Sequence, residues 1–112
     1  MLSKVQTEIV QEVVSCISSE WDKVNMDVEI GLVKGDLVTS PKAYFNFGEK
    51  REQFSINYDA VLLFEELRES MQEKDSEHRA WSVCYLEIES NGQYVFNFSY
   101  DAPARLTKLQ NN

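Results

Sequence analysis

Few side chains in this sequence could carry chemistry, and their spacing does not assemble a catalytic or metal-binding set. His78 is the single histidine, in the charged stretch KDSEHRA. A histidine-based metal site needs a second histidine or a group of cysteines at ligand spacing, and the sequence has neither. Cys16 and Cys84 lie in apolar patterns, where the nucleophilic thiolate is disfavoured. We therefore expect no catalytic residue, no metal and no cofactor. The cysteines are interpreted as small buried thiols, with a disulfide between them as the alternative.

Carboxylates are the one abundant reactive group. The chain of 112 residues has 19 Asp and Glu against 11 Lys and Arg, a net charge of −8. Acid–base catalysis would need a pocket that shifts a carboxyl pKa, and no sign of one is visible in the sequence. The four glycines are scattered singly, so a glycine-rich phosphate loop is excluded. We expect no enzyme, and an acid-dependent hydrolase is only a weak third interpretation.

The acidity also indicates which partners suit the protein. Nucleic-acid binders present basic patches, because neutralising phosphates supplies most of their non-specific affinity. No basic cluster appears, so direct binding to nucleic acid or to an anionic membrane is not expected. A basic partner is favoured, because the field of an acidic domain speeds encounter with one. Simple solubility is the alternative explanation for the same charge.

The densest acidic cluster lies in the segment 59–77, which has seven acids and two basic residues. Like charges four residues apart destabilise a helix by about 0.2–0.5 kcal/mol per pair. A solvated face is the commoner reason for such a cluster, and a patch that meets a basic partner is the other. The residues of that second interpretation are Glu65, Glu66, Glu69 and Glu73.

Two periodicities alternate along the chain and predict the elements that position these residues. Apolar residues from Leu2 to Trp21 recur at intervals of three or four, which indicates a helix. A second helix is predicted over 59–75, with Asp59 as its N-cap. Apolar and polar residues alternate in several other segments, as in half-buried strands, and Asn91-Gly92 is a hairpin signal. The predicted strands are 24–32, one that ends in 43–47, 53–57, 80–89 and 94–100.

These elements predict one α+β domain over residues 1–112, in the order α-β-β-β-α-β-β. We expect a mainly antiparallel five-stranded sheet with two helices on one face. Pro103 ends the last strand, and residues 103–112 are expected to be a mobile polar tail. The first residues lack the continuous apolar run of a signal peptide, and no segment is long enough to span a bilayer. We therefore expect a cytoplasmic protein.

The last strand, QYVFNFSY, places aromatic residues at every second position. They are interpreted as the inner wall of the core, with Phe96 and Phe98 facing inward. Alternation then sends the intervening side chains to a sheet face with no helix over it. Tyrosines there are typical interface anchors, and the acidic helix offers charge without an aromatic anchor, so we expect the open face at the centre of a contact. An ordinary solvated sheet face is the alternative interpretation. The candidate contact residues of the open face are Asp27, Glu29, Tyr44, Asn46, Tyr85, Glu87, Asn97 and Ser99.

Four stretches follow one another in an order known from other proteins: EWDKVNMDVEI, YFNF, a second acidic helix, and AWSVCYLEIESNGQYVFNFSYD. Through them, from about Ile9 to Asp101, the chain resembles the YezG-like family of bacterial immunity proteins. The matching positions are packing and turn residues, densest in the last two strands, and none is catalytic. The YDAPARL end departs from the acid-rich ends of some members.

The resemblance implies a cytoplasmic protein that binds and blocks the nuclease toxin domain of a polymorphic or contact-dependent inhibition system. It transfers no site residues, because specificity in such families lies on variable surfaces. Together with the acidity, it predicts a non-catalytic immunity protein whose partner is a toxin domain with a basic surface. The alternative is a small-ligand or protein-binding domain that uses the open sheet face.

Overall fold

The computed structural model of this protein describes residues 2–111. Its elements follow the order α-β-β-β-α-β-β-α. Their bounds are α1 Leu2–Ser15, β1 Lys23–Val33, β2 Asp36–Phe47, β3 Lys50–Phe54, α2 Tyr58–Lys74, β4 Val83–Glu89, β5 Tyr94–Ser99 and α3 Ala104–Gln110. The strands form one antiparallel sheet in the order β3-β2-β1-β4-β5. The predicted α+β class and element order are confirmed, with α3 added at the C-terminal end.

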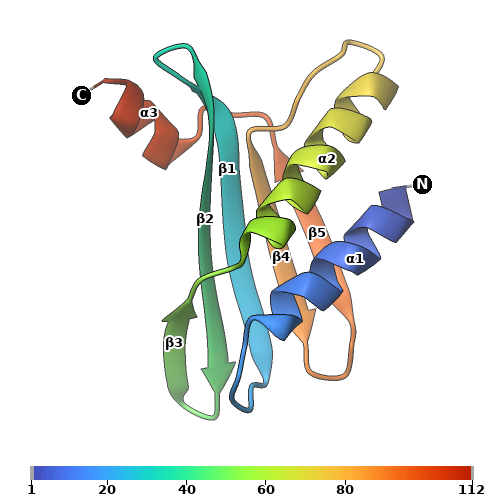
Figure 1. The fold of residues 1–112 in the computed structure, drawn as a ribbon, viewed down its shortest axis with the longest axis vertical. Helices are drawn as coiled ribbons and strands as arrows, with labels where there is room; N and C mark the ends of the chain where they lie inside the picture. Colours follow the sequence, from blue (N-terminus) through green and yellow to red (C-terminus); the bar gives the residue numbers. More distant parts are fainter. Residues whose placement is uncertain (1, 112) are drawn as a thin grey trace.

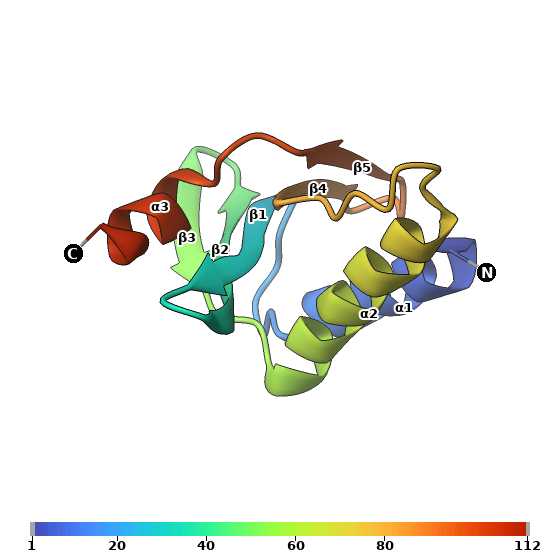
Figure 2. The same ribbon diagram turned by 90° about the horizontal axis from the view of Figure 1, so that it is seen from above.

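Two helices cover one face of the sheet. Figures 1 and 2 show α1 and α2 side by side across this face, with α3 apart from them at the β1–β2 end. The core lies between the two layers. Alternate residues of β1, among them Val24 and Val28, are fully buried there against Ile9 of α1 and Phe64 of α2. The polar residues between them, such as Asp27, therefore face away from α1 and α2.

The helix ends differ from the sequence prediction in two places. The N-cap of α2 is Asn57, whose Oδ1 accepts a hydrogen bond from the Ala60 N–H at 2.8 Å, so the prediction of Asp59 was wrong. The third strand ends at Phe54, which leaves the following residues free to form this cap. The apolar period of the first helix runs on to Trp21, but α1 ends at Ser15, whose hydroxyl donates to the Glu12 carbonyl.

The segment 103–112, expected as a mobile tail, contains the helix α3. Pro103 supplies no side-chain cap, and the cap comes instead from the middle of β1. One oxygen of Glu29 accepts from the Arg105 and Leu106 amides at 2.9 and 3.0 Å. Leu106 is buried over Gly31. A Cβ added at Gly31 would lie 3.4 Å from the Leu106 Cδ1. The sequence prediction missed α3 because a seven-residue helix without its own cap has little local signal.

The two edge strands of the sheet differ in charge. The edge strand β3 has the sequence KREQF, in which three of five residues are charged. The other edge strand, β5, has the sequence YVFNFS and no charged residue. Charged side chains on an edge strand hinder pairing with strands of other molecules. Only β3 carries this protection.

Both cysteines are free thiols, as the sequence predicted, but only Cys84 is buried, so the prediction of a buried Cys16 was wrong. Cys84 is fully buried, and this burial, with a smaller effect of the nearby Asp27 carboxylate, raises the pKa of its thiol far above the ordinary value. Cys16 is partly exposed, and its thiol donates to the Glu12 carbonyl at 3.3 Å.

Alkylation should separate the two thiols. Iodoacetamide at pH 8 should modify Cys16 in the native protein, and Cys84 only after unfolding in urea, because the thiolate is the reacting form. Peptide mass spectrometry over a time course measures both rates. Labelling of Cys84 as fast as Cys16 in native buffer would contradict its burial.

Candidate functional site

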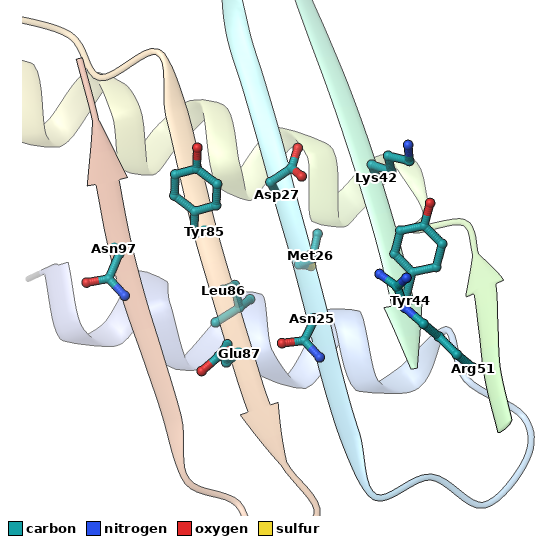
Figure 3. A pocket seen from close by; sticks show the side chains of 10 residues that line it. All are labelled: Asn25, Met26, Asp27, Lys42, Tyr44, Arg51, Tyr85, Leu86, Glu87 and Asn97. Atoms are coloured by element: carbon teal, nitrogen blue, oxygen red, sulfur yellow. The ribbon is translucent and has the colours of Figure 1, made fainter. Parts of the chain in front are cut away.

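The open face of the sheet carries two rows of outward side chains. Asn97, Tyr85, Asp27 and Lys42 lie in register across four strands. The next row runs through Glu87, Asn25 and Tyr44. These rows line an open depression of about 320 Å³, seen in Figure 3. Tyr85 is 47% exposed, so the predicted register of β4 is confirmed.

Basic groups interrupt the expected surface of tyrosines, amides and acids. The guanidinium of Arg51 lies over the Tyr44 ring, 3.9 Å from its centroid, and the Lys42 ammonium lies 5.9 Å from the same centroid. Figure 3 shows Arg51 reaching from β3 toward Tyr44. The Lys23 ammonium lies 3.6 Å from a Glu87 carboxylate oxygen. This face therefore has mixed charge, which suits a strongly basic partner less well than the sequence suggested.

Two of the predicted contact acids are engaged by α3. The Arg105 guanidinium lies 2.6 Å from Asp27 Oδ1 and 3.3 Å from Glu29 Oε2. It also donates to the hydroxyl and the carbonyl of Ser40. Glu29 is 4% exposed, so it cannot form a partner contact, and its prediction as a contact residue was wrong. The prediction that no helix covers this face was also wrong at this end of the sheet.

The remaining predicted residues of this face lie nearer its margins. Asn46 is opposite Lys23 and Arg51, between β1 and β3. Ser99 lies at the end of β5, where its hydroxyl accepts from the Asp101 amide at 3.2 Å. The face therefore brings Tyr44, Tyr85, Glu87 and Asn97 together.

The exposed side of α2 forms a second surface, which we call the α2 ridge: Tyr58, Leu62, Glu66, Glu69 and Glu73. Glu65 does not belong to it, because its carboxylate turns toward β2 and accepts from the Thr39 hydroxyl at 2.6 Å. Tyr58 is 72% exposed. The α2 ridge therefore contains an exposed aromatic residue, whereas the sequence analysis expected none there. Tyr58 was missed because the helix was predicted to begin one residue later.

Two further observations concern residues 2–111. No group of three or more His, Cys, Asp or Glu side chains within this range is placed to hold a metal ion. None of the helices described there is long and apolar enough to cross a membrane. His78 lies exposed in the loop before β4, beside Asp75, which accepts from the Arg79 side chain. That hydrogen bond lowers the pKa of the Asp75 carboxyl to about 2.

Comparison with known proteins relates the chain to a bacterial secretion system. No family model matches the sequence. The chain is similar to the type VII secretion system protein EsaG of Staphylococcus aureus (strain NCTC 8325 / PS 47), with 30% identity over 112 residues. The match spans 88% of this chain and 68% of the Staphylococcus protein. It therefore extends over most of the fold rather than over one motif.

Proposed function

Because this chain belongs to the family of the type VII secretion system protein EsaG, we propose that it is an immunity protein. It binds a toxin secreted by the producing bacterium and neutralises it in the cytoplasm, without catalysing a reaction. The resemblance to the YezG-like immunity proteins supports the same role. The toxin is a nuclease, because an acidic inhibitor suits an enzyme that must hold phosphates with cationic groups.

The observation that carries this proposal is the α2 ridge on a protein of net charge −8. Glu66, Glu69 and Glu73 are exposed on one side of α2, and the first turn of the helix presents the exposed ring of Tyr58. Opposite charges on two partners accelerate their encounter, and rapid capture is what self-protection requires. A buried tyrosine ring is a typical anchor of such a contact. We expect an interface of about 1,200–2,000 Å² in total.

Co-expression tests the immunity function directly. The toxin domain encoded beside the gene for this chain should be harmless in cells that also make the chain, and the two proteins should copurify. A toxin that stays lethal and does not copurify would contradict the proposed function. An inactive toxin variant, copurified in the same way, shows whether binding requires toxin activity.

Charge reversal on the α2 ridge should slow toxin capture. Glu66→Lys combined with Glu69→Lys should lower the association rate constant by about tenfold or more at low ionic strength, because steering by opposite charges is lost. The difference should shrink at high salt. Stopped-flow fluorescence measures the association rate constants of the wild type and the variant at low and at high salt.

The matched control is Glu49→Lys with Glu89→Lys, which makes the same change in net charge at exposed positions away from α2. An equal loss in both variants would assign steering to net charge rather than to the ridge. An unchanged rate in the ridge variant would remove α2 from the contact.

The open sheet face supports a second candidate function, the binding of a small ligand. Its depression of about 320 Å³ lies at the lower end of the size of ligand sites. Tyr85 presents its ring there, the Tyr44 ring lies under Arg51, and the Asp27 carboxylate is paired with Arg105 (Figure 3). A Tyr85→Ala variant that loses more toxin affinity than the ridge variant would instead make this face the centre of the protein contact.

A further inference from the structure

The end of the β1–β2 hairpin exposes two leucines side by side. β1 pairs with β4 only from Lys23 to Glu29, so the hairpin projects beyond the sheet. Leu32 and Leu37 are direct cross-strand partners in this projection. They are 68% and 55% exposed. Two neighbouring leucines of this exposure form a small apolar patch at the end of the hairpin.

The hairpin end is held in place rather than free. Lys34 and Gly35 form its two-residue turn, with φ values of 52° and 91°. Two positive φ values are typical of the tight turn that matches the twist of paired strands. The Lys34 amide donates to the Gln110 side chain of α3. An apolar patch fixed in this way loses little conformational entropy when a partner covers it.

A hollow of about 240 Å³ separates the hairpin from α2. Figure 1 shows the β1–β2 turn and the second half of α2 diverging at this end of the molecule. Ile30 and Leu37 line the hairpin side of the hollow, and the helix side is lined by Glu65, Arg68, Glu69 and Gln72. We call this site the hairpin groove. It joins an apolar wall to an acidic wall, which has two glutamates and one arginine.

The charges of the hairpin groove select a basic occupant. Thr39 holds the Glu65 carboxylate by a 2.6 Å hydrogen bond, and Glu69 is exposed at the rim. Arg68 also lines the groove, but its Nε donates to the Trp81 carbonyl at 2.7 Å, so its guanidinium already has a partner. Two carboxylates therefore outnumber the one guanidinium on this wall. Glu69 also belongs to the α2 ridge, so the groove continues that surface.

We infer that the hairpin groove is the docking site for a basic amphipathic segment of the toxin. An apolar side chain of that segment packs against Leu37 in the groove and its exposed cross-strand partner Leu32, and a neighbouring Lys or Arg pairs with Glu65 and Glu69. This inference rests on the proposed immunity function and names the surface that performs it. A second copy of the chain is a poorer occupant, because it brings the same net charge of −8 to an acidic wall.

The test measures affinity for the inactive toxin domain encoded beside this gene. Leu32→Ser combined with Leu37→Ser should weaken binding by at least tenfold, because two apolar side chains no longer leave water on binding. Isothermal titration calorimetry gives the dissociation constants, and thermal melts confirm that the variant is folded. The matched control is Val95→Ser with Phe47→Ser, two positions that are 53% and 46% exposed and lie away from the β1–β2 turn. The control should bind like the wild type.

The acidic wall has its own variant. Glu65→Gln with Glu69→Gln should weaken binding at low salt and reduce its dependence on salt concentration.

A wild-type chain that does not bind the toxin domain refutes the immunity function itself. A wild type that binds, with serine variants as tight as the control, overturns the groove and leaves the immunity function standing. Sedimentation measurements in which the wild type dimerises and the leucine variant does not would assign the patch to a second copy and overturn the inference.

Discussion

Replacing Glu29 with alanine should detach α3 from the sheet and lower the free energy of unfolding by about 3 kcal/mol. The Glu29 carboxylate is 4% exposed and accepts from two backbone amides at the start of α3. It also lies 3.3 Å from the Arg105 guanidinium. Without the Glu29 carboxylate, the two amides and the guanidinium lose the acceptor that replaced their water. This loss of stability is at the lower end of the range for breaking a buried ion pair, because 31% of the Arg105 side chain is exposed and Asp27 remains beside it.

Urea denaturation measures the stability, and hydrogen exchange at the Arg105 and Leu106 amides measures the release of α3. Both amides should lose protection in Glu29→Ala while the core strands keep theirs. The matched control is Glu87→Ala on the same sheet face, where a solvent-exposed pair with Lys23 is lost. Such pairs contribute about 0–1 kcal/mol. Unchanged stability and unchanged exchange in Glu29→Ala would show that Leu106 and the other contacts of Arg105 are enough to hold α3.

Replacing Phe64 with alanine should lower the free energy of unfolding by about 3–5 kcal/mol. The Phe64 side chain is fully buried where α2 meets the sheet, so its loss removes apolar burial and leaves a cavity. The melting temperature should fall by more than about 10 °C. Since α2 carries the ridge and one wall of the hairpin groove, toxin binding should weaken with it.

Differential scanning calorimetry measures the Phe64→Ala effect, and Leu62→Ala is the matched control on the same helix. Leu62 is 42% exposed, so its truncation should cost less than about 1 kcal/mol. Similar losses in both variants would contradict the packing of α2 described above.

The arrangement of the elements was predictable because its signals are local. The alternation from Val24 to Leu32 predicts β1 within one residue at each end. Asn91-Gly92 predicts the β4–β5 hairpin, and Gly92 has the positive φ of 94° that such a turn needs. The third strand was misplaced because Lys50 and Arg51 were assigned to a turn. Polar strand residues resemble turn residues when no apolar face marks them.

The candidate site was predictable only where alternation decides it. The outward direction of Tyr85 follows from the buried residues on both sides of it in β4. The mixed charge of the open face does not follow from alternation, because Arg51 reaches Tyr44 from a strand whose position was wrong. The contact of Arg105 with Glu29 joins residues 76 positions apart in the sequence. Long-range contacts of this kind leave no periodic trace in the chain.

Because only one edge strand of the sheet is charged, the net negative charge of the chain also limits its aggregation. The free edge of β5 combines unpaired backbone groups with aromatic and β-branched residues, the features of segments that nucleate fibrils. With no charged side chain on that strand, the barrier to edge-to-edge stacking is the repulsion between whole molecules of net charge −8. This repulsion vanishes near the isoelectric point of about 4.6 and is screened beyond about 10 Å in 0.1 M salt. Storage in dilute salt well above that pH therefore protects the β5 edge.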